Sequence, residues 1–318
     1  CEGHKRMGGQ RIVVTGGAGF VGSNLIARLE DLGGYDVVVL DNEVLGSRDA
    51  IAVLDTTFIK GDICDPDAVE KALDGADTVI HLAADTRVIP SISEPKFNFD
   101  VNVGGSLVIL ETMRRMGIDR IINASTGGAI IGEANPPVHE GMVASPASPY
   151  GASKLVVEGY CSAYSACYGM KAASLRFSNV YGPRSWHKGS VVALFIKQIL
   201  RGETLTVYGD GEQTRDYVHA QDLADGIIAA IQSDASGPIQ LGTGLGTPLN
   251  AIIDMLREIS GQEIAVKYEP FRDGEIVHTW CDISHARATL GYDPKIAVRD
   301  GLEESWRWFV DNRERLSL

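Results

Sequence analysis

The sequence predicts an α/β fold, a doubly wound parallel sheet followed by a second, smaller mixed α/β domain. Three observations support this. Short apolar strands alternate with helical stretches up to about residue 175, as in a parallel sheet that is covered on both faces. A glycine-rich turn joins the first strand to the first helix. Beyond residue 175 the alternation ends and the chain becomes richer in loops.

Strands are expected at five apolar runs in the first part, residues 11–15, 37–40, 57–59, 78–81 and 120–124. Helices are expected over 23–32, ending at Gly33-Gly34, and near 98–116 and 149–168. The second part has expected helices over 191–201, 222–232 and 250–259 and a strand over 206–208. We therefore place the first domain at 10–175, with a returning segment near 215–235, and the second mainly at 176–318.

Composition excludes several classes of partner. The net charge is −13, and no basic face stands out, which argues against binding to nucleic acid. No apolar run approaches the roughly 20 residues that cross a bilayer, so no membrane contact is expected. We expect a cytoplasmic protein whose natural start is Met7. The five cysteines lack metal-ligand spacing, which predicts free thiols and no metal site.

The turn after the first strand has the spacing of a dinucleotide site. Gly16, Gly19 and Gly22 permit a tight turn and a close approach of the backbone to a pyrophosphate, and Phe20 and Val21 between them are expected to contact the cofactor. Such a turn between strand and helix is the signature of a Rossmann domain.

The ends of the next strands complete the cofactor site. Asp41 closes the second strand 19 residues after Gly22, where a carboxylate accepts from both adenine-ribose hydroxyls and repels a 2′-phosphate. NAD is therefore favoured over NADP. Asn42, the residue after Asp41, is also expected to bind the cofactor. Asp62 and Ile63 follow the third strand and could bind adenine. Alternatively, Asp62 caps a helix. Leu82, Ala83 and Ala84 let the chain pass close under the dinucleotide, whereas His81 is expected to be a hydrogen-bonded core histidine.

Tyr150 and Lys154 form the predicted catalytic pair, because residues at i and i+4 project from one helix face. A free phenol has a pKa near 10, and a neighbouring cation together with a positive nicotinamide would lower that value. Pro149 starts the helix. Ser125 and Thr126 follow a strand, so their hydroxyls are expected where ligands bind in such sheets, and either could hydrogen-bond the reacting oxygen.

These motifs resemble the extended short-chain dehydrogenase/reductase superfamily, in its NAD-dependent nucleotide-sugar epimerase/dehydratase branch. The resemblance runs from about residue 11 to 310. The segment 175–184 resembles the substrate loop, in which Ser178 faces the sugar and Asn179 holds the diphosphate. Segments 209–219 and 272–275 resemble those that supply arginines to the diphosphate, here Arg215 and Arg272, and a carboxylate to the uridine ribose, here Glu275. The resemblance implies further substrate contacts at Arg87, Thr126, Val191 and Tyr208.

Within this branch the residues after Thr126 favour a UDP-sugar 4-epimerase. Dehydratases of this branch carry Asp-Glu directly after the threonine, and decarboxylases carry the motif Thr-x-Glu. In this sequence Gly127 and Gly128 follow Thr126 instead. When the segment is aligned with the family from the preceding strand, Thr126 stands at the position of the catalytic hydroxyl. When it is aligned backwards from Gly132, Gly127 stands there instead. Ser178 mildly favours UDP-glucuronate over UDP-glucose or UDP-galactose. Dehydratase, decarboxylase and reductase activities, and a non-catalytic NAD-binding regulator, are the alternatives.

A homodimer is expected from the helices near 98–116 and 149–168. The second of these carries small and apolar residues at spacings that suit packing against a symmetry mate. They are Ala152, Val156, Val157, Cys161, Tyr164 and Cys167.

Overall fold

The computed structural model describes residues 9–271, 276–314 and 316. They form two compact units, one of residues 9–125, 148–175 and 227–238 and the other of 126–147, 176–226 and 239 onward. The segment 126–147 thus lies in the second unit and the returning segment is 227–238. Backbone bonds from Val138 to Trp280 and from Asp282 to Val138 explain the first difference, because they tie 126–147 to the C-terminal part of the chain.

The first unit is built on a seven-stranded sheet of order β11-β6-β5-β4-β1-β2-β3. Its strands are β1 (Gln10–Thr15), β2 (Tyr35–Asp41), β3 (Thr57–Lys60), β4 (Thr78–His81), β5 (Arg120–Thr126), β6 (Lys171–Phe177) and β11 (Gly237–Leu241). Strand β1 pairs in parallel with β2 and β4, which in turn pair in parallel with β3 and β5. The predicted doubly wound sheet is confirmed.

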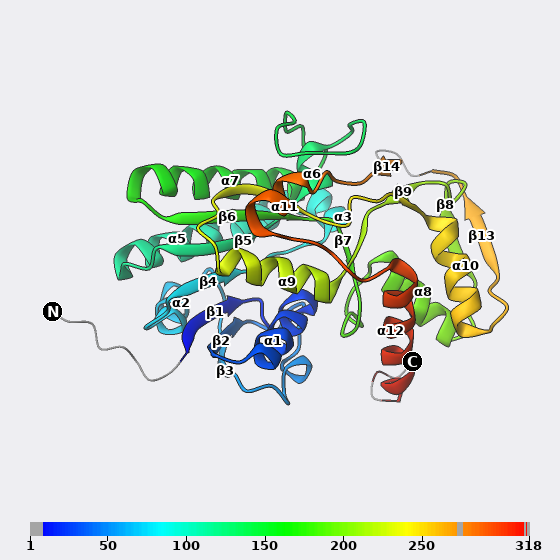
Figure 1. Ribbon diagram of the computed structural model, residues 1–318, viewed down its shortest axis with the longest axis horizontal. Coiled ribbons are helices and arrows are strands. Elements are labelled where there is room, and N and C mark those ends of the chain that lie inside the picture. Colours follow the sequence, from blue (N-terminus) through cyan, green and yellow to red (C-terminus); the bar gives the residue numbers. More distant parts are fainter. Residues whose placement is uncertain (1–8, 272–275, 315, 317–318) are drawn as a thin grey trace. The chain divides into compact units, whose positions relative to one another are not determined.

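Helices cover both faces of this sheet (Figure 1). Helices α2 (Pro66–Leu73), α5 (Gly105–Met116) and α7 (Pro149–Tyr168) share one core with the strands, around Leu73, Ile109 and Val157. Helix α1 (Phe20–Leu32) lies on the opposite side and buries Leu25, Ile26 and Leu29.

The predicted helix near 98–116 is interrupted. Short helices α3 (Val88–Ser93) and α4 (Pro95–Phe99) lead into a π-helical turn, η2 (Asp100–Gly104), and only then into α5. A π turn is rare and is often found at a functional site, and this one carries the buried Asn102.

Helix α7 has the bounds that the sequence predicts, because Ser148 caps its first turn and Gly169 ends it in the left-handed region. Three of the residues expected at a dimer interface, Val157, Cys161 and Tyr164, are instead buried in the chain's own core. That part of the prediction is wrong, because the inward face of α7 is the one that packs on α5. The outward face carries Val156 and Tyr160.

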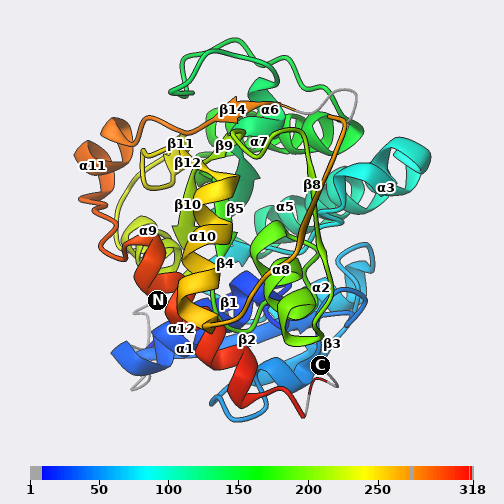
Figure 2. The same cartoon turned by 90° about the vertical axis from the view of Figure 1, so that its right-hand side faces the viewer.

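The second unit has helices α6 (Gly127–Ile131), α8 (Val191–Leu200), α10 (Leu249–Ser260), α11 (Ser284–Leu290) and α12 (Val298–Asp311). Helices α8, α10 and α12 pack side by side around Phe195, Ile253 and Phe309 (Figure 2). Its short strands are β7 (Asn179–Tyr181), β8 (Leu205–Tyr208), β9 (Thr214–Arg215), β10 (Tyr217–His219), β12 (Thr247–Pro248), β13 (Val266–Glu269) and β14 (His278–Thr279). Helix α9 (Ala220–Ile231) runs from this unit into the first.

Within the described ranges, no helix is both long and apolar enough to span a membrane. Cys64, Cys161, Cys167 and Cys281 are free thiols, as predicted.

Candidate active site

The predicted cofactor residues lie where the strand order of the sheet reverses. Strands β2 and β3 lie on one side of β1, and β4 and β5 lie on the other. Ligands bind at the carboxyl ends of strands at such a switch point. The glycine-rich turn follows β1 there, and the half-exposed Leu82, Ala83 and Ala84 follow β4.

The turn after β1 has room only for glycine. Gly16 has a φ of +71°, and a Cβ there would come within 2.7 Å of the Ala83 nitrogen. A Cβ on Gly22 would come within 2.5 Å of Gly17 Cα, so this glycine sets how closely α1 approaches the turn. Gly19 precedes α1, whose first turn has no side-chain cap and no acidic residue. An uncapped helix start behind a glycine turn fits the pyrophosphate of a dinucleotide.

Asp41, the predicted ribose-binding residue, ends β2 and is 7% exposed. One carboxylate oxygen accepts from the Ala18 amide at 3.0 Å and the other from the Glu43 amide at 2.7 Å. Burial raises the pKa of Asp41, although these two amides oppose the shift. The carboxylate is therefore held rigidly beside the turn, since Ala18 belongs to the glycine-rich segment.

The structure brings Asn42 and Asp62 together, with Asn42 Nδ2 donating to Asp62 Oδ2 at 2.7 Å. The Cys64 amide donates to the other oxygen at 2.8 Å. Burial opposes ionisation, yet these two bonds hold the pKa of Asp62 below its ordinary value. Asp65, rather than Asp62, caps α2. Ile63 is buried in the core.

Tyr150 and Lys154 lie in the first turns of α7. Lys154 is 5% exposed, and its ammonium donates to the Ala124 carbonyl at the end of β5 at 3.0 Å. The Tyr150 phenol has no hydrogen-bond partner among the described residues. Burial, and then the charge of Asp85, raise the pKa of Tyr150 to about 12. The predicted lowering of this pKa therefore stays a prediction for the protein with its cofactor bound.

The two candidate hydroxyls differ sharply in their surroundings. Ser125 is 4% exposed and donates to Glu158 Oε1 at 2.6 Å. Thr126 is half-buried, and its side chain neither caps α6 nor hydrogen-bonds any other described residue. A Cβ on Gly127 would come within 2.4 Å of the buried Gln240 Oε1, so no hydroxyl residue could stand there without a shift.

Several residues around the pair were not predicted. Asp85 is 5% exposed and forms a bidentate ion pair with Arg87, at 2.8 and 3.1 Å. Arg87, a predicted substrate residue, therefore already has a carboxylate partner. The Ser91 hydroxyl accepts from the Tyr150 amide at 3.2 Å. Glu158 lies one helical turn beyond Lys154, and this i+4 spacing is the signal that could have found it.

In the second unit, predicted substrate residues gather around a buried carboxylate. The Asn179 amide donates to the carbonyl of Asp216, the residue after Arg215, at 2.9 Å, and Asn179 pairs with Tyr217 between β7 and β10. The Asp216 side chain accepts from Thr243 and from the Gly244 and Cys281 amides. The Ser178 hydroxyl lies 3.3 Å from Cys281 Sγ.

The remaining predicted substrate residues are spread over this unit. Tyr208 ends β8, and its carbonyl accepts from Gln213 at 2.7 Å. Val191 begins α8. Arg215 donates to the Ile276 and Val277 carbonyls at 2.6 and 3.0 Å. Arg272 and Glu275 lie outside the described residues.

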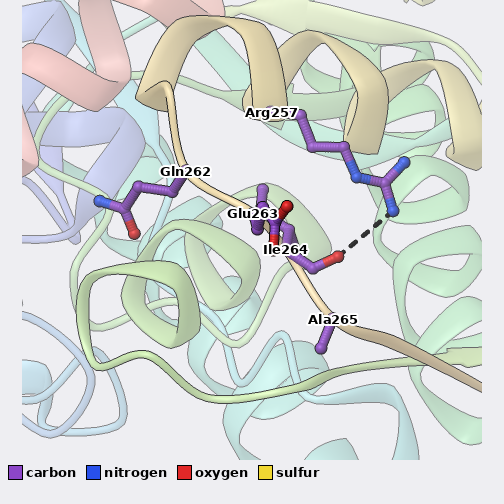
Figure 3. Close-up of a pocket in the computed structure, with 5 residues that line it drawn as sticks. All are labelled: Arg257, Gln262, Glu263, Ile264 and Ala265. Carbon is purple, nitrogen blue, oxygen red and sulfur yellow. Dashed lines mark hydrogen bonds between the residues drawn. The ribbon is translucent and has the colours of Figure 1, made fainter.

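A hollow between α10 and β13 contains none of these residues. It is lined by Arg257, Gln262, Glu263, Ile264 and Ala265, and Arg257 donates to the Ile264 carbonyl across it (Figure 3). This hollow therefore adds no group to the predicted site.

Comparison with known proteins agrees with this geometry. The NAD dependent epimerase/dehydratase family matches residues 12–242. The chain belongs to this family. Membership confirms the predicted family, the fold class and NAD as the cofactor, and it makes the chain an enzyme.

Solved structures of this family resemble the chain over nearly its whole length. A UDP-glucose 4-epimerase from Thermotoga maritima, with UDP-glucose, is 36% identical with a TM-score of 0.90 and covers 95% of this chain and 99% of its own. A UDP-glucuronic acid 4-epimerase from Bacillus cereus, with UDP-glucuronic acid and NAD, is 32% identical with a TM-score of 0.89 and the same coverage. A dTDP-glucose 4,6-dehydratase from Streptomyces venezuelae, with NAD, is 31% identical with a TM-score of 0.89, covering 96% and 98%.

Proposed function

We propose that the protein is an NAD-dependent UDP-sugar 4-epimerase, which inverts C4 through a transient 4-keto sugar without net redox change. The observation that carries the proposal is the end of β5. Thr126 offers a hydroxyl there that bonds no other described residue, and Gly127 and Gly128 follow it. Elimination of water from the sugar needs an acid and a base beside that hydroxyl, and two glycines supply neither.

The packing of Gly127 strengthens this choice. The space that a side chain would occupy is filled by the buried amide of Gln240. An aspartate at this position, as in the dehydratase pattern, would have to displace that amide. Return of the hydride to the opposite face of the keto sugar is then the simplest outcome.

Each residue has a defined task in this reaction. Tyr150 takes the proton of the sugar 4-hydroxyl and later returns it. Lys154 holds the nicotinamide ribose and favours the phenolate, and Thr126 hydrogen-bonds the sugar oxygen. When bound, NAD⁺ supplies the hydride acceptor and a positive charge that further favours the phenolate.

The substrate's diphosphate is assigned to the second unit. Asn179 hydrogen-bonds the residue that follows Arg215 there, and an arginine can pair bidentately with phosphate oxygens. This assignment explains how a chain with a net charge of −13 binds an anionic substrate. Arg272 and Glu275 are proposed to contact phosphate and ribose on the resemblance alone.

The choice of sugar turns on Ser178. A small hydroxyl residue here leaves room for a uronate carboxylate, and related enzymes crystallised with UDP-glucose and with UDP-glucuronic acid resemble the chain almost equally. Parallel incubations with UDP-glucose, UDP-galactose, UDP-N-acetylglucosamine and UDP-glucuronate, followed by proton NMR, would identify the substrate.

The same spectra separate the alternatives. An epimerase gives the C4 epimer, a dehydratase a 4-keto-6-deoxy sugar, and a decarboxylase a pentose with release of CO₂. A reductase consumes NADH. A regulator that only binds NAD leaves every sugar unchanged, and that outcome would refute the proposed activity.

We also propose that the protein is a homodimer through the outward face of α7. Val156 and Tyr160, one helical turn apart, are 38% and 39% exposed, and Phe97 and Phe99 of α4 are 46% and 54% exposed. Helices α4 and α7 are in contact, so these side chains can form one apolar surface. Light scattering at micromolar concentration should give twice the chain mass, and Tyr160→Glu should give the monomer.

A further inference from the structure

A chain of buried hydrogen bonds connects residues 82–84, here called the cofactor loop, to the helix that carries Tyr150, and His81 lies in the middle of it. His81 ends β4 and is 2% exposed. Its Nδ1 lies 2.7 Å from Thr15 Oγ1 at the end of β1, and its Nε2 lies 2.8 Å from Ser106 Oγ on α5. All three residues belong to the first unit.

The direction of each bond follows from the neighbouring partners. Thr15 Oγ1 accepts from the Ala83 amide at 3.3 Å, so its own proton can go to His81 Nδ1. Ser106 Oγ donates to the Asn102 carbonyl, so it accepts from His81 Nε2. The ring is thus neutral and protonated on Nε2, and both of its nitrogens are satisfied. Burial and the charge of Lys154 lower the pKa of His81 to about 3, which agrees with a neutral ring.

The chain continues from the π turn to α7. The Asn102 side chain accepts from the Asp85 amide at 2.7 Å and donates to Ser153 Oγ at 3.0 Å. The Ser153 hydroxyl donates to the Tyr150 carbonyl at 2.8 Å. Asn102 and Ser153 are 1% and 4% exposed, so no water competes for these bonds.

We propose that His81 is a positioning residue, which holds the cofactor loop and the first turn of α7 in one register through Thr15, Ser106 and Asn102. A neutral imidazole accepts at Nδ1 and donates at Nε2, and its rigid ring holds both partners across this gap. The inference deepens the proposed function and rests on it for the role of Tyr150.

The test compares two threonine-to-valine changes. Thr15→Val removes the hydroxyl that joins Ala83 to His81. Thr78→Val removes an equally buried hydroxyl at the other end of the adjacent strand, where Thr78 accepts from Gln10 at 3.0 Å and its side chain bonds no other described residue. Both variants lose similar packing and one hydroxyl, so they differ chiefly in the link to His81.

Thr15→Val and His81→Gln should raise the dissociation constant of NAD, measured by calorimetry on cofactor-free protein, by roughly 5- to 30-fold. They should lower kcat by about tenfold or more while KM for the UDP-sugar changes less than about twofold. Thr78→Val should leave both NAD affinity and kcat near native values, and Thr15→Ser should restore them.

If Thr15→Val and His81→Gln bind NAD and turn over like Thr78→Val, the positioning role is refuted. Should Thr15→Val not fold, Ser106→Ala breaks the same chain outside the glycine turn and is judged by the same two measurements. NAD affinity needs no sugar. A native protein that binds NAD but epimerises no sugar would therefore refute the proposed function. The NAD affinities of the variants would still decide the role of His81.

Discussion

The Ser125 hydroxyl donates to the Glu158 carboxylate at 2.6 Å, one helical turn beyond the lysine that holds the Ala124 carbonyl. Ala124 and Ser125, at the end of β5, are thus both hydrogen-bonded to side chains on one face of α7. Thr126, the next residue, keeps its hydroxyl unengaged with the rest of the described chain. We therefore propose Thr126 as the catalytic hydroxyl and Ser125 as a structural residue.

This assignment predicts opposite effects for two alanine variants. Thr126→Ala should lower kcat roughly 10- to 100-fold with little change in stability, because it removes only a hydrogen bond to the reacting oxygen. Ser125→Ala should keep kcat within a few-fold but lower the free energy of unfolding by about 1–3 kcal/mol, because the buried hydrogen bond to Glu158 is lost. Steady-state kinetics and urea unfolding of both proteins check this, and a larger kcat loss in Ser125→Ala would reverse the roles.

Tyr150→Phe should leave the binding of NAD and UDP-sugar nearly intact while turnover falls by roughly 10²–10⁴. The ring keeps its packing, and only the acid/base group is lost. Calorimetry for both ligands and initial rates measure the split. Turnover near the native rate would mean that another residue moves the proton.

Asp41→Ala should weaken NAD far more than the UDP-sugar and relax the exclusion of NADP. It removes two ribose hydrogen bonds to a charged acceptor, each worth roughly 1.5–3 kcal/mol at most. Asp41→Asn is the matched control, since it can keep an acceptor for the Ala18 or the Glu43 amide while losing the charge. Unchanged affinity for NAD in the alanine variant would show that another residue reads the ribose.

Arg215→Ala should raise KM for the UDP-sugar roughly 10- to 100-fold and change kcat much less, because its guanidinium is assigned to the diphosphate. Arg215→Lys keeps the charge but not the fork and should fall between the two. A variant with native KM would remove Arg215 from the binding site.

His81 should make stability depend on pH below neutrality. Its ordinary pKa is 6.5 and the folded value is about 3, so the unfolded chain takes up the proton first as pH falls. Stability is thus full well above pH 6.5 and is lost progressively toward pH 3, by about 1.6 kcal/mol between pH 6.5 and 5. Comparing urea unfolding of native protein and His81→Gln at both pH values isolates this share, because other groups, such as His219, titrate in both proteins. An equal pH dependence in the two proteins would contradict a neutral His81.

Sequence patterns predicted the regular elements well where local signals mark both ends. Strand β4 and helix α7 have the expected bounds, since the helix lies between a capping Ser148 and a left-handed Gly169. Helix α1 begins three residues earlier than its apolar period shows, because Gly19 takes the capping position. Strand β6 was missed, since Ala172, Ala173 and Ser174 carry little strand signal of their own.

The parts of the site that depend on distant residues could not be predicted. The pairing of Asn102 with Asp85 and Ser153 joins three separate segments, and the π turn that presents Asn102 leaves no mark in the sequence. The direction of α7 was half right, since periodicity shows an apolar stripe but not whether it faces the core or a partner. Thr126 and Ser125 look alike in sequence, and only their contacts separate them.

The central claim is C4 inversion by Tyr150 with a retained cofactor. The most direct measurement is proton NMR of the purified protein with a single C4 epimer of each UDP-sugar, with Tyr150→Phe run in parallel. The account predicts that, for at least one sugar, the native protein reaches an equilibrium mixture of both C4 epimers with no change in total NADH, while the variant leaves the starting epimer nearly untouched. A 4-keto-6-deoxy product, or stoichiometric oxidation of NADH, would contradict it.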